Sequence, residues 1–207
     1  GNDLQKIRNN INLYTSKLMP LIENIFVGYE EGESIEKLIA KKLTSNNLTI
    51  SFAESFTGGK ISDTLVSVAG ASSFFKGSLV CYSTASKVNN LNVDKDLIDK
   101  YSVVSKEVVE SMALNVKKMF NSDYSLATTG NAGPTKGDSN KEIGTVYIGI
   151  ATPEKVFSFE FNFGNSRERV TGKSVNKSLE LILKELLKNW HIIFVIYQRI
   201  CKFAPRN

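Results

Sequence analysis

Histidine and cysteine are scarce in this sequence, and their scarcity excludes several kinds of site. The one histidine, His191, adjoins an apolar run, and the only cysteines, Cys81 and Cys201, lie far apart. Zinc sites need several such side chains at short spacing, so we predict no metal site. A catalytic triad that depends on histidine is disfavoured as well. A hydroxyl nucleophile in this chain needs a different base, and a desolvated lysine is the known substitute.

Long apolar runs and a secretory pattern are also absent. No stretch of about 18 apolar residues occurs, so no membrane span is expected. The N-terminus lacks the basic and then apolar pattern of a signal peptide, which with the few dispersed cysteines predicts a cytoplasmic location. Positions 188–207 contain four cations and no acid in a chain of formal charge +5, so the remainder is nearly neutral. Nucleic acid is therefore not an expected partner.

Residues 48–59 combine a strand pattern with a turn rich in hydroxyl groups and glycine. Apolar residues alternate with small ones over residues 48–53, which predicts a strand, and residues 61–68 have helical spacing. Ligands bind at the carboxyl ends of parallel strands, where Gly58 and Gly59 let the backbone approach a ligand and leave helix amides for an oxyanion. A plain strand-to-helix turn with Thr57 as N-cap is the alternative.

The remaining apolar patterns predict helices that alternate with strands, followed by a hairpin. Strands are expected at residues 78–82, 124–129, 145–151 and 157–163, the last two antiparallel. Helices are expected at residues 3–18 and 35–43 and after the capping positions Ser83, Ser105 and Ser166. Pro20 is expected to end the first helix. We therefore predict a three-layer α/β/α sandwich with a mixed, partly parallel sheet.

Three segments are expected along the chain. Residues 1–32 form an N-terminal helix and connector, residues 33–189 the main domain, and residues 190–207 an apolar and basic tail. The first helix has a narrow apolar seam, which needs a partner surface on the main domain or on a second copy. The tail is too short to span a bilayer and too apolar to stay in water, so we expect it to pack against another surface.

Cationic side chains follow two of the expected strand ends. Lys87 comes shortly after Tyr82 and is the best-placed base for a hydroxyl nucleophile, the alternative being a solvated helix lysine. Arg167 and Arg169 follow Ser166, where free amides and the positive end of a helix favour an anion such as phosphate. The alternative is that both arginines pair with surface carboxylates. No Walker or dinucleotide fingerprint occurs.

Seven short motifs occur in one order along the chain. They are Ala-Glu-Ser-Phe-Thr-Gly-Gly at 53–59, Gly-Ala-Ser-Ser-Phe-Phe-Lys-Gly at 70–77, Tyr-Ser at 82–83 with Lys87, Val-Ser at 104–105, Thr-Gly-Asn-Ala-Gly-Pro at 129–134, Gly-Thr-Val at 144–146 and Gly-Asn-Ser-Arg at 164–167. Together they resemble the CinA C-terminal domain family, which includes nicotinamide mononucleotide deamidases. The resemblance covers about residues 33–189. Residues 4–32 look like the connector that follows a molybdopterin-binding-like domain in longer members.

The resemblance implies an amidohydrolase that converts nicotinamide mononucleotide to nicotinate mononucleotide and ammonia, without a metal or other cofactor. It implies that Ser55 is the nucleophile, Lys87 its general base and Tyr82 a hydroxyl that assists proton transfer. The residues expected to bind the substrate are Thr57, Gly58, Gly59, Thr129, Gly130, Gly133, Ser166 and Arg167. The expected partners are the pyridine mononucleotide and further copies of the same chain.

The sequence departs from the family pattern beside the expected site. Phe56 stands where the family usually has cysteine, residues 84–86 replace Asn-Glu-Ala, Asn131 replaces isoleucine, and residues 135–138 alter the usual glycine pair. The expected catalytic groups are retained. A second interpretation stays open, in which the domain keeps the fold and binds a ligand or dimerises without catalysis, in a competence- or damage-related role.

Overall fold

The computed structural model describes residues 4–22, 34–137 and 139–201, which fall into two units. The first unit, residues 1–32, contains helix α1 (Leu4–Ile22), and the second contains the other described elements. The predicted end of the first helix at Pro20 is wrong, because α1 continues to Ile22 with Pro20 inside it. Proline has a helical φ, and near a helix end only one amide hydrogen bond is lost. The seam residues Ile11 and Tyr14 are exposed.

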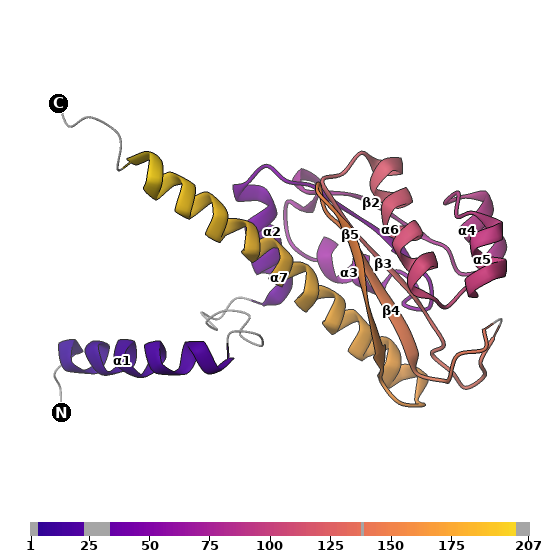
Figure 1. The fold of residues 1–207 in the computed structure, drawn as a ribbon, viewed down its shortest axis with the longest axis horizontal. Helices are drawn as coiled ribbons and strands as arrows, with labels where there is room; N and C mark the ends of the chain where they lie inside the picture. The colour runs from indigo at the N-terminus through magenta and orange to yellow at the C-terminus, as the bar shows by residue number, and fades with distance from the viewer. Residues whose placement is uncertain (1–3, 23–33, 138, 202–207) are drawn as a thin grey trace. The chain divides into compact units, whose positions relative to one another are not determined.

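A five-stranded mixed sheet forms the centre of the second unit, in the order β2-β1-β3-β4-β5 (Figure 1). The strands are β1 (Ile50–Glu54), β2 (Phe75–Val80), β3 (Tyr124–Gly130), β4 (Thr145–Ala151) and β5 (Val156–Asn162). β1 pairs parallel with β2 and β3, whereas the β3–β4 and β4–β5 pairs are antiparallel. The predicted mixed sheet and its antiparallel hairpin are confirmed. β2 begins earlier than predicted and ends before position 82.

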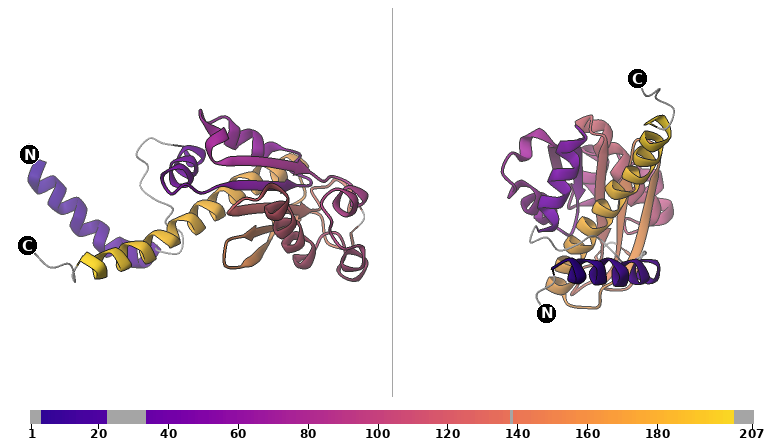
Figure 2. Two further views of the ribbon diagram at one scale, coloured as in Figure 1. Left: turned by 90° about the horizontal axis from the view of Figure 1, so that it is seen from above. Right: turned by 90° about the vertical axis from the view of Figure 1, so that its left-hand side faces the viewer.

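Helices cover both faces of this sheet (Figure 2). On one face α6 (Lys106–Phe120) contacts all five strands, and α5 (Lys95–Tyr101) packs on α6. On the other face α2 (Ile35–Ser45), α3 (Lys60–Val66) and α7 (Arg167–Cys201) contact one another. The predicted three-layer α/β/α sandwich is therefore confirmed. In the described ranges no helix is long and apolar enough to cross a bilayer.

α7 passes through position 190 as one continuous helix, where the sequence suggested a separate tail. The expected boundary near residue 32 and the side chains of the tail lie outside the described residues.

The core explains why the strand ends are fixed. All five residues of β1 are buried, because helices cover both of its faces. The predicted apolar face of α6 is buried against the sheet, with Val108, Val109, Met112 and Val116 fully enclosed. The parallel neighbours β1 and β3 thus end side by side at one edge of a rigid sheet.

Candidate active site

The turn after β1 is held by Glu54, the last residue of the strand. Its fully buried carboxylate accepts hydrogen bonds from the amides of Gly59 (3.0 Å), Ile61 (3.2 Å) and Ser62 (2.9 Å). The Ser62 hydroxyl donates a further bond of 2.6 Å. A carboxylate at the amino end of α3 satisfies amides that have no partner within the helix and faces the positive end of its dipole.

Glu54 therefore fills the capping role that the sequence alternative assigned to Thr57. The residue directly before α3 is Gly59 with a φ of 94°, and Gly58 before it has a φ of 63°. These left-handed conformations, which glycine adopts without strain, turn the first helix amides toward Glu54. The expectation that these amides hold a substrate oxyanion is wrong, since the carboxylate already occupies them.

Two buried threonines fix the backbone around Ser55. The Ser55 amide donates to Oγ1 of Thr128 on β3 (3.4 Å), and the same oxygen lies 2.9 Å from Oγ1 of Thr57. The two threonine side chains are 0% and 1% exposed. Of the two hydroxyl groups in the turn, only that of Ser55 lines the pocket described below.

Lys87 brings its amine to Ser55 from helix α4 (Thr84–Asn89), which Ser83 caps as predicted. The side chain is 1% exposed, and its Nζ lies 3.0 Å from Oγ of Ser55. The same nitrogen donates to the carbonyl oxygens of Cys81 (2.8 Å) and Tyr82 (3.4 Å). The alternative of a solvated helix lysine is therefore wrong, because the sheet edge and the turn enclose the amine.

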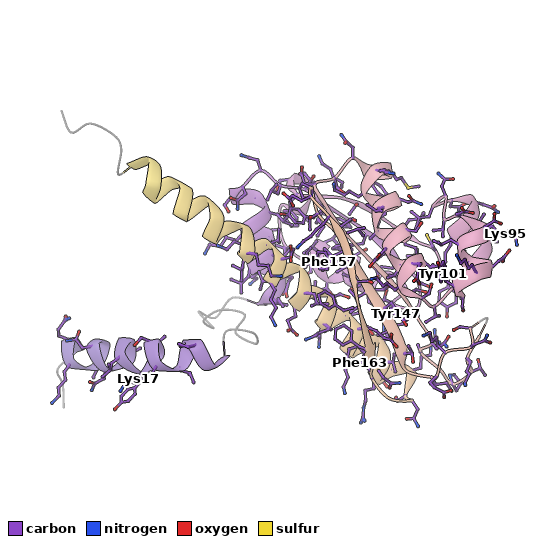
Figure 3. The ribbon with its side chains drawn as sticks, in the orientation of Figure 1. Lys17, Lys95, Tyr101, Tyr147, Phe157 and Phe163 are labelled. Carbon is purple, nitrogen blue, oxygen red and sulfur yellow. The ribbon has the colours of Figure 1, made fainter. Side chains whose placement is uncertain are left out.

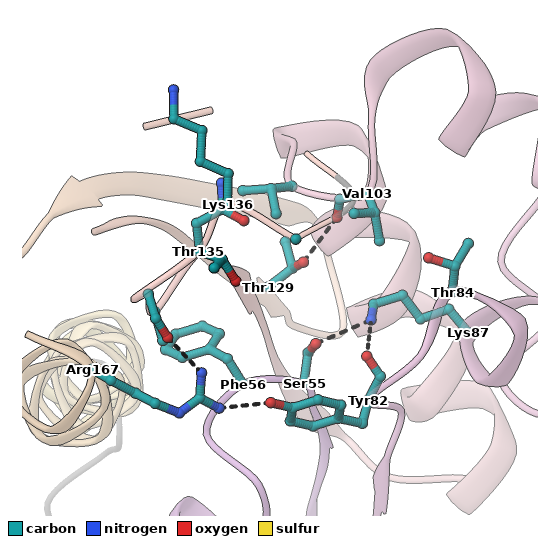
Figure 4. Close-up of a pocket in the computed structure, with 16 residues that line it drawn as sticks. Ser55, Phe56, Tyr82, Thr84, Lys87, Val103, Thr129, Thr135, Lys136 and Arg167 are labelled. Carbon is teal, nitrogen blue, oxygen red and sulfur yellow. Dashed lines mark hydrogen bonds between the residues drawn. The ribbon is translucent and has the colours of Figure 1, made fainter. Parts of the chain in front are cut away.

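An open pocket of about 230 Å³ lies in front of this pair (Figure 4). The turn after β1, the start of α4, the loop after β3 and the first residue of α7 form its walls. Its described lining residues include the basic side chains of Lys136 and Arg167, besides Lys87, and no acid. This charge distribution suits a small anionic ligand.

Arg167 ties two loops together at the mouth of the pocket. It is the first residue of α7, and its Nη1 donates to the carbonyl of Gly133 (2.9 Å). Its Nη2 donates to the hydroxyl oxygen of Tyr82 (2.6 Å). The loops after β2 and β3 are thus held at one guanidinium group, which excludes the alternative that Arg167 serves only to pair with a surface carboxylate.

The hydroxyl of Tyr82 does not lie where the role implied by the resemblance would need it. Its side chain is 60% exposed, and its hydroxyl points to Arg167 and away from the amine of Lys87 (Figure 4). What reaches Lys87 is the backbone carbonyl of Tyr82. The structure therefore does not support proton transfer by this hydroxyl and instead makes it a support for Arg167.

The other residues expected to bind substrate fall into two groups. Thr129, Gly130 and Gly133 line the pocket, where the Thr129 hydroxyl donates to the carbonyl of Val103 (2.8 Å). Outside the lining lie Thr57, Gly58, Gly59 and Ser166. The binding surface is therefore built more from the loop after β3 than from the glycines of the first turn.

Cys81 lies beside Lys87 but has no opening to the pocket. Burial raises the pKa of its thiol, an effect that the charge of Lys87 and a hydrogen bond with Ser86 partly oppose. A protonated thiol is a poor nucleophile, so Cys81 does not compete with Ser55. In the described ranges no group of three or more His, Cys, Asp or Glu side chains is placed to hold a metal ion.

Comparison with known proteins assigns the family. The sequence model of the CinA C-terminal domain matches residues 32–186. This chain belongs to the CinA C-terminal domain family. It is 51% identical over 190 residues to a CinA-like protein of Flavobacterium psychrophilum, covering 92% of this chain and 46% of that protein. A CinA-like protein of Fervidobacterium nodosum is 36% identical over 88% of this chain and 45% of its own length. The chain thus spans about half the length of these curated relatives.

Solved structures of CinA proteins share the fold. A competence or damage-inducible protein from Enterobacter asburiae superposes with a TM-score of 0.71 at 31% identity, over 73% of this chain and 96% of that structure. A competence/damage inducible protein from Agrobacterium tumefaciens gives a TM-score of 0.68 at 28% identity, over 72% and 94% of the two chains. The mixed sheet described above is therefore the architecture of the family.

Three residues of this CinA C-terminal domain matter to the site and were not predicted. Glu54 and Thr128 hold the turn, and Phe56 lines the pocket while packing on Val146 and Val170. An acid at the end of an apolar strand, just before a helix, was a signal that could have identified Glu54. The role of Thr128 depends on its position across the sheet, and no local pattern gives that.

Proposed function

We propose that this chain is an amidohydrolase that converts nicotinamide mononucleotide to nicotinate mononucleotide and ammonia. The observation that carries the proposal is the 3.0 Å contact between Nζ of Lys87 and Oγ of Ser55, two buried side chains on the wall of one pocket. The substrate has a carboxamide for the nucleophile and a phosphate for the cationic lining. The names of the similar proteins refer to competence and damage induction and state no enzymatic activity, so the deamidase activity is our proposal.

The contacts of Lys87 suit a neutral amine. A neutral amine has two hydrogens and one lone pair, and the carbonyls of Cys81 and Tyr82 can accept the two hydrogens. Nζ donates to Oγ of Ser55 in the structure, and in the uncharged amine this direction reverses, so that the lone pair accepts the hydroxyl hydrogen of Ser55. Burial favours this uncharged form, because it disfavours an ammonium group. This contact supports the proposed role of Lys87 as general base to Ser55.

The reaction then has two halves. In the first, Oγ of Ser55 attacks the carboxamide carbon while Lys87 takes its proton, and Lys87 returns that proton to the departing nitrogen, which leaves as ammonia. An ester between Ser55 and the nicotinate carbonyl remains. In the second half, Lys87 takes a proton from water as the water oxygen attacks the ester carbon, and Oγ of Ser55 leaves with that proton. Neither half needs a redox step.

We assign the substrate phosphate to Arg167. A guanidinium group has five N–H donors, and the bonds to Gly133 and Tyr82 fix its orientation while others stay available to an anion. The amino end of α7 adds the positive end of a helix dipole. Lys136 also lines the pocket, where its Nζ pairs with Glu142 at 2.7 Å. The phosphate therefore lies at the mouth and the carboxamide at Ser55.

Ammonia release from purified protein supplied with nicotinamide mononucleotide tests this function. We expect ammonia and nicotinate mononucleotide in equal amounts from the wild type and neither from Ser55→Ala. Calorimetric binding of the mononucleotide is measured in parallel. Binding without ammonia release would support the alternative of a ligand-binding domain that does not catalyse, and the absence of both would remove the mononucleotide as the ligand.

A further inference from the structure

The central sheet has two edges, and they differ. β2 at one edge contains Gly77 with a φ of 144°, and its pairing with β1 shifts register between Ile50 and Ser51. Such irregularities keep foreign strands from pairing with an edge. β5 at the other edge keeps one register with β4 along all seven residues and contains no glycine, proline or lysine. In the described part of the chain β5 pairs with β4 alone, so its outer side can accept another strand.

The hydrogen bonds to β4 show which backbone groups face that open side. At one end of the hairpin the Phe163 amide donates to the carbonyl of Gly144. At the other end the Thr152 amide donates to the carbonyl of Lys155. Because pairing alternates along an antiparallel strand, the odd-numbered residues of β5 bond to β4. The residues whose N–H and C=O groups point outward are Val156, Ser158, Glu160 and Asn162.

A ladder of phenylalanines follows the odd-numbered positions of this strand. Its members are Phe157, Phe159, Phe161 and Phe163, with successive ring centroids 5.7, 6.3 and 5.4 Å apart. Figure 3 labels its first and last rings. The first, third and fourth rings have a lysine ammonium over them at 5.0, 5.6 and 5.9 Å. The ring of Phe159, at the centre of the strand, is 38% exposed. The middle of the ladder is thus the part left open to a further apolar surface.

We propose that β5 pairs with β5 of a second copy of this chain, antiparallel, about a two-fold axis at Phe159. This register joins the two strands over their full length and brings the two exposed Phe159 rings together. Ser158 then faces Glu160 of the second copy in a hydrogen-bonded pair, and Val156 faces Asn162 in the same way. The outward groups form on the order of eight main-chain hydrogen bonds.

Length and charge favour this register over its neighbours, because a shift of the axis in either direction leaves one end of β5 unpaired. Shifting the axis by one residue toward the C-terminus places Glu160 opposite Glu160, and like charges directly opposite destabilise a strand pair. Shifting it toward the N-terminus leaves Glu160 and Asn162 opposite Val156 and position 154, so Asn162 then has no partner within β5. In the proposed register Glu160 faces a serine. The side chains on that face are already held, since Ser158 donates to Glu110 at 2.8 Å and Tyr147 donates to Glu160 at 2.7 Å. The resulting ten-stranded assembly is independent of the proposed catalysis.

Charged substitutions of Phe159, which lies at the axis, test the pairing. The wild type should sediment as a dimer, and Phe159→Lys or Phe159→Glu should each raise the dimer dissociation constant at least about tenfold, because like charges then meet at the axis. An equimolar mixture of the two variants should recover the dimer. Met119→Lys, at an α6 side chain that is 46% exposed, is the matched control and should leave the dimer intact. A monomeric wild type, or a dimer that both Phe159 variants retain, would overturn the pairing.

Cysteine cross-linking fixes the register and does not depend on charge. Under mild oxidation Phe159→Cys should form a covalent dimer, because the facing Cα atoms of a non-hydrogen-bonded pair lie about 4.5 Å apart, within disulfide reach. Phe157→Cys should cross-link poorly alone but efficiently with Phe161→Cys, its facing residue. Wild-type chain, which contains Cys81 and Cys201, sets the background, and circular dichroism checks each fold. Efficient cross-linking of Phe157→Cys alone would contradict this register.

Discussion

The proposed chemistry requires the amine of Lys87 to be both buried and uncharged. The pH dependence of catalysis and a substitution of Lys87 test this requirement. We expect kcat/KM to rise with pH as the amine loses its proton, with a midpoint below that of a free lysine, because burial disfavours the ammonium form. Lys87→Arg should be inactive, since a guanidinium group stays charged. Exposed Lys60→Arg is the matched control. An active Lys87→Arg enzyme would exclude the Ser-Lys pair.

Ser55 should be indispensable and nevertheless unimportant for the fold. Its hydroxyl supplies a covalent step that positioning alone cannot replace, so Ser55→Ala should lower kcat at least about a thousandfold. The melting temperature should stay close to that of the wild type, because the backbone bond from residue 55 to Thr128 does not use the side chain. Near-normal turnover would place the nucleophile elsewhere, and the buried hydroxyl of Thr57 is not a ready substitute.

Arg167 should act through binding. One charge-assisted hydrogen bond contributes roughly 1.5–3 kcal/mol, so Arg167→Ala should lower kcat/KM for nicotinamide mononucleotide about ten- to a hundredfold, mainly through KM. Nicotinamide riboside, which lacks the phosphate, is the control substrate. The wild type should use it poorly, and the substitution should hardly change that activity. An equal loss on both substrates would mean that Arg167 supports the chemistry or the loops and not the phosphate.

The placement of single residues was predictable where the backbone position decides it. Ser55 and Lys87 each follow a strand end, and the sheet brings those two ends together. Side chains whose direction depends on distant elements were not predictable. The hydroxyl of Tyr82 turns toward α7 because Arg167 binds it, and that of Thr57 turns inward because Thr128 on β3 binds it.

At the scale of elements, the junction of β1 and α3 depends on Glu54. In Glu54→Gln one carboxylate oxygen becomes an NH₂ group that faces amide donors, so buried amides lose their acceptor. We expect the free energy of unfolding to fall by about 2–4 kcal/mol, measured by urea denaturation. Turnover should fall as well, because the turn positions Ser55. Exposed Glu168→Gln is the control, and equal stability of the two variants would show that Glu54 is not the cap.

Element types were predictable from periodicity, whereas several ends were not. The alternation over positions 157–163 identified the hairpin, and the apolar spacing after Ser105 identified α6. The end of α1 was misplaced because the φ of proline is helical, so the helix continues past Pro20 to Ile22 at the cost of one amide hydrogen bond. The cap of α3 was misassigned because threonine is a common N-cap residue and the sequence pattern made Thr57 the candidate. In the structure Gly59, with a positive φ, directly precedes α3, and the Glu54 carboxylate accepts the hydrogen bonds of the first amides.

For the whole molecule, strand order was the feature beyond reach of local patterns. β1 lies between β2 and β3, and the last two strands reverse direction, so the order depends on crossovers and not on neighbouring sequence. This order brings Ser55 and Thr129 together at the carboxyl ends of the neighbouring strands β1 and β3. It leaves β5 as the outermost strand of the sheet. The pocket and the proposed dimer edge are therefore separate, and each can be altered without the other.

The end of α7 gives a test of that separation. The helix continues to Cys201, whereas the family match ends at residue 186 and the pocket uses only the first residue of α7. Cutting after Asn189 removes an apolar run, so the truncated chain should elute at a smaller size at equal concentration if that run mediates self-association, and should stay a dimer if β5 alone does. In either case we expect kcat/KM within about twofold of the wild type. If β5 holds the dimer, Phe159→Lys should reduce the size and the truncation should not. An unchanged elution volume and melting temperature would show that the run takes no part in self-association, and a loss of activity would mean that it supports the site from a distance.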